Sequence, residues 1–484
     1  MNNLTLIDRP ALIAPNQVKQ LQDDCDCACP STTVLPELSF SRLGEGKVQL
    51  ASDLQTLPLT DHQCGVWASS TNAPCVVNQS LYAILNSFAT PQLISKVTPE
   101  LWPMVARCTE LGLLTLDQVK PSVQKSDVLV AWLHITNSCN LRCKYCYLAK
   151  TEEAMTAEVG RAAIDALLRS AELHHYPAIK LKFAGGEPSL NFPLILELQE
   201  YAATQAAQRG IRLESVVLSN GVGLTKPQLL QMQASGIELM ISLDGMEKEQ
   251  DAQRTFANGA SSFRAVSNTI ERAQALGTTP YISATISGQT AAGLADLVGW
   301  LLERDLPFSF NFYRESKYST NYKELELDET KIINGMKAAF RVIEANLPPR
   351  SLLGSLIDRS DLSVAHHKTC GVGENYLVID PQGQIAKCHM EIERPITTIY
   401  TADPLAVIRA ETSGIQNLLV EEKEDCRACQ WKHWCTGGCS WATFRATGRY
   451  DTKSPNCQIY KALYPEAIRL EGLRLLRYGL PQIF

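Results

Sequence analysis

Hydrophobic and polar positions follow two alternating rhythms along the middle of the chain. Short apolar runs rich in β-branched and aromatic residues predict buried strands, the first being VLVAWLHIT at 128–136. Segments with apolar residues three and four positions apart lie between them and predict helices. The predicted strands are 128–136, 179–186, 213–219, 238–243, 281–286 and 307–313, and the predicted helices are 156–173, 193–208, 226–235, 261–276, 290–303 and 328–345. This series predicts an α/β fold whose parallel sheet is curled as an incomplete barrel or doubly wound.

This alternation of predicted strands and helices is absent on either side of the region. Residues 76–116 predict two or three short helices, and Gly112 is a plausible helix stop. After about residue 350, cysteines and turn residues dominate, which is typical of a small domain organised by metal rather than by a large core. We therefore predict three units, at 1–120, 121–350 and 351–484.

Composition and charge exclude several classes of protein. The 484 residues are 45% hydrophobic and 20% charged, which excludes wholesale disorder. The net charge of −6 predicts neither a nucleic-acid partner nor a polybasic membrane surface. The first residues lack the pattern of a secretory signal, and no apolar stretch approaches the roughly 20 residues of a membrane-spanning helix. We expect a soluble, cytoplasmic protein.

Sixteen cysteines are unusual for such a protein. Thiols stay reduced in the cytoplasm, so clustered cysteines there indicate metal binding or catalysis. Cys139, Cys143 and Cys146 follow the first predicted strand in the segment CNLRCKYCYL. One loop can thus offer three thiolates to an iron–sulfur cluster, which usually takes four, and leave one iron open. A zinc loop or unligated thiols are the alternatives.

This cysteine segment, together with FAGGEPSL, LSNG and SLDG further along, resembles the radical S-adenosylmethionine (radical SAM) superfamily over about residues 128–315. The resemblance implies a partial (β/α)6 radical SAM barrel. It also implies a [4Fe–4S] cluster whose open iron binds S-adenosylmethionine. An electron, supplied by a donor such as flavodoxin or ferredoxin, then yields methionine and a 5′-deoxyadenosyl radical that abstracts hydrogen from the substrate.

The resemblance assigns cofactor binding to residues of these four motifs. They are Tyr145, Gly185, Gly186, Glu187, Ser219, Asn220, Ser242 and Arg254. In the family, the glycines allow close backbone approach, the glutamate accepts from the methionine ammonium, and the serine–asparagine pair contacts the ribose. Ser242 and Arg254 bind the carboxylate in related maturases, and Tyr145 lies beside adenine. Taken singly, GGEP is an ordinary turn, Arg254 a solvated residue and Tyr145 a packing residue.

The C-terminal cysteines form a second pattern. They are Cys370, Cys388, Cys426, Cys429, Cys435, Cys439 and Cys457, and the middle four read C-x2-C-x5-C-x3-C. This spacing resembles the seven-cysteine SPASM domain of peptide- and protein-modifying enzymes, which holds two auxiliary [4Fe–4S] clusters. By this resemblance the first, second and sixth of the seven hold an inner cluster and the other four hold an outer one. Zinc is the alternative for the middle four by themselves.

The inner cluster has no evident fourth ligand. Sulfatase-type maturases carry an extra cysteine between the first two of the seven, and this chain has none there. An open iron that binds substrate is our hypothesis. A ligand such as His366, His367 or Glu374, or a cysteine of the N-terminal unit, is the alternative.

The N-terminal unit loosely resembles the α+β winged-helix-like modules that recognise leader peptides, and a plain packing domain is the alternative. Cys25, Cys27 and Cys29 alternate and would share one face of an extended segment, as a metal or redox site or as unligated thiols. No role follows for Cys64, Cys75 and Cys108.

Together these patterns predict a radical SAM/SPASM maturase with three [4Fe–4S] clusters, acting on a ribosomally made precursor peptide or protein. A thioether or carbon–carbon crosslink is favoured as the product, over side-chain oxidation or epimerisation, because three clusters suit a net oxidation. The alternatives are a sulfatase-type maturase that makes formylglycine and, from another class, a non-catalytic metal-binding protein.

Overall fold

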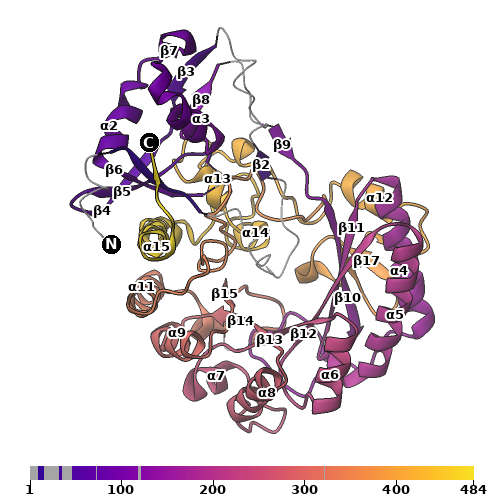
Figure 1. Cartoon of the computed structure of the whole chain (residues 1–484). Helices are drawn as coiled ribbons and strands as arrows, with labels where there is room; N and C mark the ends of the chain where they lie inside the picture. The colour runs from indigo at the N-terminus through magenta and orange to yellow at the C-terminus, as the bar shows by residue number, and fades with distance from the viewer. Residues whose placement is uncertain (1–8, 16–31, 35–45, 72, 118–121, 321) are drawn as a thin grey trace.

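The fold is described from a computed structural model, shown in Figure 1. The described residues are 9–15, 32–34, 46–71, 73–117, 122–320 and 322–484. Cys25, Cys27 and Cys29 lie outside these ranges.

A nine-stranded sheet forms the centre of the molecule, and six of its strands are parallel and adjacent in chain order. These strands are β10 (Val128–Thr136), β11 (Ala178–Gly185), β12 (Arg212–Ser219), β13 (Glu238–Ser242), β14 (Tyr281–Ile286) and β15 (Phe308–Phe312). The helices that follow them are α4 (Ala157–Leu173), α5 (Phe192–Gln208), α6 (Lys226–Ala234), α8 (Phe263–Ala275), α9 (Leu294–Glu303) and α11 (Glu329–Ala345). Figure 1 shows the helices along the outside of the curved sheet. The predicted α/β barrel is confirmed, and the short α7 (Glu247–Gln253) was not predicted.

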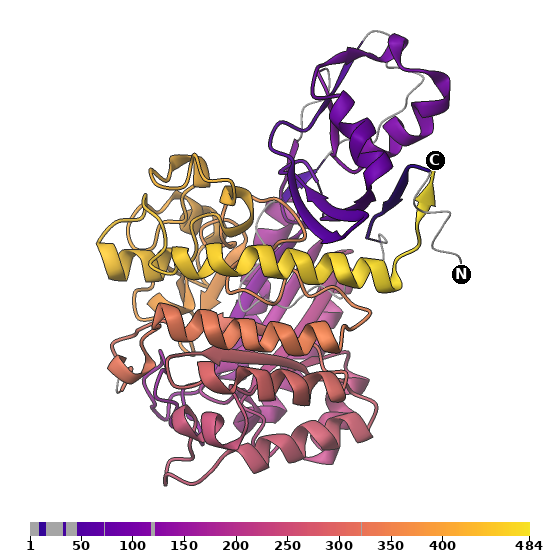
Figure 2. The same ribbon diagram turned by 90° about the vertical axis from the view of Figure 1, so that its left-hand side faces the viewer.

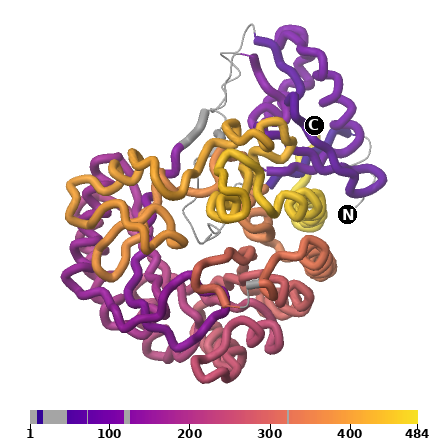
Figure 3. Tube along the Cα trace, turned by 180° about the vertical axis from the view of Figure 1, so that it is seen from behind, coloured from indigo at the N-terminus to yellow at the C-terminus, as the bar shows by residue number. Residues whose placement is uncertain are grey.

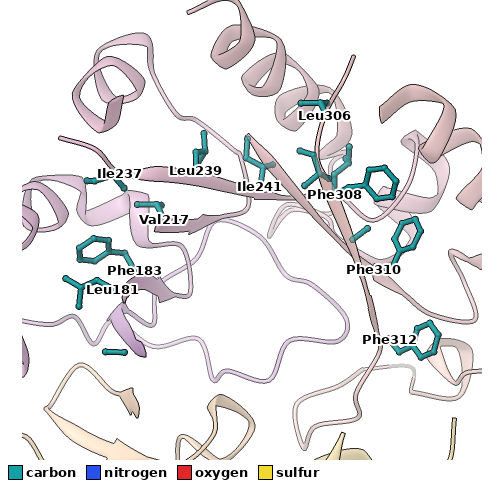
Figure 4. Packing of buried hydrophobic residues seen from close by; sticks show 14 of the residues in the cluster. Leu181, Phe183, Val217, Ile237, Leu239, Ile241, Leu306, Phe308, Phe310 and Phe312 are labelled. Carbon is teal, nitrogen blue, oxygen red and sulfur yellow. The ribbon is translucent and has the colours of Figure 1, made fainter. Parts of the chain in front are cut away.

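The two faces of the sheet differ in chemistry. Residues two positions apart, such as Phe308, Phe310 and Phe312, share a face and belong to the main hydrophobic core, as Figure 4 shows. The alternate residues include Ser283 and Asn311, whose side chains are hydrogen-bonded to each other at 3.1 Å. The concave side of the barrel is therefore partly polar.

The C-terminal residues extend this same sheet. Strand β16 (Tyr376–Ile379) pairs in parallel with β10, and β17 (Gln384–Ala386) and β18 (Thr397–Thr398) follow antiparallel. The remaining helices of this part are α12 (Pro404–Ala410), α13 (Lys432–Cys435) and α14 (Ser440–Thr447), and a short α10 (Tyr322–Leu325) precedes α11. The small C-terminal unit is thus joined to the barrel by hydrogen bonds.

The last helix of the chain is α15 (Cys457–Tyr478), which has 22 residues. It begins at the last of the seven C-terminal cysteines and runs alongside α11, as Figure 2 shows. Arg469 of α15 is ion-paired with Glu344 of α11. After it, β19 (Gln482–Ile483) pairs with β1 (Ala11–Ile13), so the C-terminus joins the N-terminal unit. In the view from behind, the orange and yellow C-terminal segments lie between the N-terminal unit and the barrel (Figure 3).

The described residues of the N-terminal unit form short strands and two α-helices. A five-stranded sheet joins β19 and β1 to β6 (Cys75–Asn78), β5 (Gln63–Trp67) and β4 (Gln55–Thr60). A second sheet contains β7 (Gln92–Leu93), β3 (Lys47–Leu50) and β8 (Leu114–Leu116), with α2 (Gln79–Ser87) and α3 (Trp102–Glu110) between β6 and β8 in the chain. The described part is completed by the pair β2 (Thr32–Val34) and β9 (Ser122–Gln124). Gly112 follows α3 with φ +75°, as predicted for a helix stop.

Cys75 and Cys108 are buried in the hydrophobic core of the N-terminal unit, and Cys64 packs against it. Burial raises the pKa of Cys75 and of Cys108 to about 12. Both thiols therefore stay protonated and behave as small apolar side chains. No helix of the described residues is long and apolar enough to span a membrane.

Candidate active site and auxiliary metal sites

The loop after β10 carries the first three cysteines to one cavity at the carboxyl ends of the strands. Cys139, Cys143 and Cys146 line this cavity. Seven of the eight predicted cofactor-binding residues line it with them: Tyr145, Gly185, Gly186, Ser219, Asn220, Ser242 and Arg254. The structure therefore brings together residues that were assigned from separate motifs.

The two glycines after β11 let this cysteine loop lie against the end of the strand. Gly186 N donates to Thr136 O at 2.6 Å, and Glu187 N donates to Ser138 O at 2.9 Å. A Cβ atom on Gly186 would lie 2.2 Å from Ser138 O, and Gly185 has φ +137°. Only glycine fits this backbone-to-backbone contact, which holds the loop in place.

Glu187 lies behind the cavity wall rather than in it. Its carboxylate is fully buried and accepts hydrogen bonds from Ser219 Oγ at 2.9 Å, Asn220 N at 2.6 Å and Ser189 N at 3.1 Å. Burial raises the pKa of this carboxyl, while the donors oppose the rise. The side chain thus fixes the end of β12, which carries the two residues assigned to the ribose.

A buried group around Asp244 forms another part of the cavity. Tyr145 Oη donates to Asp244 Oδ2 at 2.6 Å, and Arg254 donates to Tyr145 Oη and lies 3.8 Å from the same carboxylate oxygen. Asp244 also accepts from Thr285 N and Gln253 Nε2, both at 2.8 Å. Burial and the carboxylate of Asp244 keep the pKa of Tyr145 well above its usual value, although Arg254 opposes the rise, so the hydroxyl stays protonated and donates.

The Nε atom of Arg254 is buried and has no hydrogen-bond partner. An unsatisfied buried donor of a charged group is costly, so it indicates an acceptor that the protein alone does not supply. A carboxylate fits this requirement, because an arginine fork binds carboxylates through two parallel N–H groups. The residues present therefore fit the carboxylate of S-adenosylmethionine.

Two groups that donate to the cysteine sulfurs were not predicted. Lys150 Nζ donates to Cys146 Sγ at 3.0 Å, and Leu141 N donates to Cys139 Sγ at 3.4 Å. Donors of this kind stabilise thiolates and tune the cluster that they hold. Sequence reasoning also missed Asp244 and Gln253, although Asp244 stands inside the SLDG motif, because their partners come from other strands.

The outer set of C-terminal cysteines also lies around one cavity. Its members are Cys426, Cys429, Cys435 and Cys457. Trp431 and Tyr464 line the same cavity, with ring centroids 5.1 Å apart. Four thiols around one cavity are a suitable donor set for a complete [4Fe–4S] cluster.

The inner set, Cys370, Cys388 and Cys439, lines a third cavity. Arg314 Nε donates to Cys439 Sγ at 3.1 Å, and Nη2 of the same arginine is paired with Asp358 at 2.7 Å. Arg314 was not predicted, because it stands in no cysteine motif. Its charge lies beside the sulfur of this cysteine set.

The fourth-ligand candidates named from the sequence do not line this inner cavity. His366 contacts Val364 O at 3.1 Å, His367 contacts Glu421, and Glu374 is paired with Lys368 at 2.7 Å. The described N-terminal cysteines pack in or against the core of their own unit. The lining includes His389 and Met390, which sequence reasoning did not consider.

The inner cavity and the cavity of the first three cysteines share a wall. Arg314, Arg359, His389 and Met390 line both. The ring of His389 stacks on Trp132 of β10, with centroids 4.8 Å apart. The two cysteine sets are thus separated by one layer of side chains.

Residues 133–301 match the Radical SAM superfamily. This segment of the chain is therefore a radical SAM domain. It is similar to an uncharacterised protein of Methanocaldococcus jannaschii, with 33% identity over 26% of this chain and 42% of the other. It is also similar to the PqqA peptide cyclase of Xanthomonas euvesicatoria pv. vesicatoria, with 25% identity over 67% of this chain and 86% of the other. The chain spans less than half the length of the first curated relatives it matches.

A solved structure shares its fold with this chain. It is that of anSMEcpe with bound AdoMet and the Cp18Cys peptide, with a TM-score of 0.58, 18% identity, and coverage of 72% of this chain and 99% of the other. This coverage extends beyond the barrel. The predicted fold class, a radical SAM barrel followed by a C-terminal SPASM-type unit, is confirmed.

Proposed function

We propose that this radical SAM protein is a SPASM-type maturase that crosslinks a ribosomally made peptide or protein through a thioether or carbon–carbon bond. The observation that carries the proposal is the shared wall between the cavity of Cys139, Cys143 and Cys146 and that of the inner cysteines. The similarity to a peptide cyclase over 67% of the chain supports a peptide substrate.

In this proposal the three cysteine sets hold three [4Fe–4S] clusters, and the first set binds S-adenosylmethionine with the residues of its cavity. The bound cofactor supplies a 5′-deoxyadenosyl radical that abstracts one hydrogen atom from the substrate. Arg254 uses its buried Nε to bind the cofactor carboxylate, while Tyr145 and Asp244 hold the guanidinium in place. Lys150 places a positive charge against Cys146.

The second half of a crosslinking reaction requires an electron acceptor. When the substrate radical bonds to a thiol or to an aromatic carbon, one electron and one proton must leave. The inner cysteine set lies behind the shared wall and is the nearest site that would accept this electron if it holds a cluster. A flavodoxin or ferredoxin would supply the first electron in the cytoplasm, and the N-terminal unit would bind the leader of the precursor.

Anaerobic reconstitution tests the radical SAM part of the proposal. The Cys139→Ala variant should lose reductant-dependent formation of 5′-deoxyadenosine and about four of about twelve iron atoms per chain. A Cys64→Ser variant is the control, because Cys64 lies in the N-terminal unit, and it should keep both. Loss of all iron in Cys139→Ala would argue against separate sites, and unchanged cofactor cleavage would refute the assignment.

The crosslink is tested by mass spectrometry. Co-expression with a candidate precursor peptide should remove two hydrogen atoms per bond formed, without an aldehyde. An aldehyde product would instead indicate a sulfatase-type maturase. Unmodified peptide together with absent 5′-deoxyadenosine would refute the enzyme function and leave a metal-binding protein.

A further inference from the structure

Three metal-binding side chains meet in the C-terminal unit outside the three cysteine sets. His367, Glu421 and His433 each offer one ligand atom, and these atoms all lie within 4.8 Å of one another. His367 Nδ1 is 2.7 Å from Glu421 Oε1, and His433 Nδ1 is 3.8 Å from the same oxygen. None of the three residues lines the cavities of the cysteine sets.

The backbone holds the three segments together. His366 N donates to His433 O at 2.8 Å, and Val420 N donates to His367 O at 2.9 Å. Each ligand is therefore on, or next to, a residue that is hydrogen-bonded to the segment of another ligand. A site assembled in this way loses little conformational entropy when an ion binds.

The Nδ1 atom of His433 is buried and has no hydrogen-bond partner. It lies on the side of the ring that faces Glu421, and the exposed fraction of the side chain is 13%. A buried polar atom without a partner is destabilising, so it indicates a ligand that would satisfy it. Glu421 has a side-chain exposure of 42%, so an ion at this point would remain within reach of water.

We propose that His367, Glu421 and His433 bind one divalent transition-metal ion of the zinc class, with water as a fourth ligand. Two imidazoles and one carboxylate are a common donor set for zinc. Tetrahedral binding at 2.0–2.1 Å places donor atoms about 3.3 Å apart, between the two distances observed here. The ion would displace the proton that joins His367 to Glu421.

An ion at this site would connect one segment that carries a cysteine of the inner set to another that carries a cysteine of the outer set. His367 lies three residues before Cys370, and His433 lies two residues before Cys435. The ion is therefore expected to hold the two cysteine sets in fixed relation, independently of any iron. This inference goes beyond the proposed function, which uses none of these three residues.

Metal analysis of the anaerobically reconstituted full chain tests the site. After loading with zinc chloride and passage over a chelating resin, the wild-type protein should retain about one zinc per chain in addition to its iron. Glu421→Gln should lose this zinc and keep the iron, because the amide oxygen still accepts from His367 and the exposed position tolerates the change. His174→Asn is the matched control, because it removes a histidine paired with a single carboxylate at 2.8 Å.

A second measurement uses only the wild-type protein. Zinc should protect His367 and His433 from modification by diethyl pyrocarbonate, mapped by mass spectrometry, and should leave His174 unprotected. Equal zinc in Glu421→Gln and wild type, or equal modification with and without zinc, would overturn the proposal. Because iron content and 5′-deoxyadenosine formation are measured in parallel, failure of the zinc site is distinguishable from failure of the proposed enzyme.

Discussion

The contact between Gly186 and the cysteine loop gives a prediction that can be worked out from the structure. In Gly186→Ala the new Cβ would lie 2.2 Å from Ser138 O and 2.6 Å from Asn137 O, whereas real Cβ contacts stay above 3.0 Å. Both oxygens belong to the backbone, so neither can rotate away. The loop that carries Cys139 must therefore move by about 0.8 Å or more.

This displacement has an energetic cost in two parts. Overpacking of a close contact costs about 1–3 kcal/mol. The hydrogen bonds from Gly186 N to Thr136 O and from Glu187 N to Ser138 O contribute about 1 kcal/mol each and would be strained or lost. The lower end of this sum, about 3 kcal/mol, corresponds to a roughly 100-fold change in an equilibrium constant.

The assay compares iron and cofactor cleavage in the reconstituted variant. With three clusters as proposed above, we expect Gly186→Ala to lose about four of about twelve iron atoms on incubation with a chelator and to form 5′-deoxyadenosine about 100-fold more slowly. Gly299→Ala is the control, because its Cβ would meet only Val342 Cγ1, at an ordinary 3.8 Å. Wild-type iron and wild-type turnover in Gly186→Ala would show that this contact does not position the loop.

Two further predictions concern charge. Lys150→Met removes the ammonium that donates to Cys146 Sγ, so the reduced form of a cluster held there loses a stabilising charge. A redox titration followed by electron paramagnetic resonance should therefore give a more negative midpoint potential, and Lys150→Arg should restore the wild-type potential. Glu344 lies against Arg469, whose hydrogen bonds lower the pKa of its carboxyl, although burial opposes this. Its contribution to stability is therefore present above about pH 4.3 and is lost as the pH falls through the lowered pKa. Urea denaturation should show Glu344→Gln less stable than wild type at pH 7, and the difference should shrink as the pH is lowered below about 4.3.

The barrel could be predicted because its strands are buried on both faces. All nine residues of β10 are buried, so the strand reads as one apolar run with the same limits in sequence and structure. The partition of the C-terminal cysteines into sets of four and three came from the resemblance to the SPASM domain, and the structure gathers each set in its own cavity.

Other features depend on contacts between distant parts of the chain. The pairing of Val130 with Tyr376 joins β10 to β16, which follows the whole barrel in the sequence, and no local pattern indicates this pairing. Helix α15 was missed because Pro465 stands inside it, which usually marks a helix end, and because its buried residues do not follow one stripe. Arg314 could not be predicted from the sequence because its partners, Asp358 and Cys439, are distant from it in the chain.

The pairing of β10 with β16 also decides how the first and inner cysteine sets relate. Cys139 lies three residues after the end of β10, and Cys388 lies two residues after the end of β17, which is paired to β16. Both cysteines therefore follow strands of one hydrogen-bonded sheet, and the ladder holds the ends of these two strands at a fixed separation. Under the proposed function, a substrate in the first cavity would lie across the shared wall from the inner cysteine set, which favours two-step oxidation of one bound residue over release between steps.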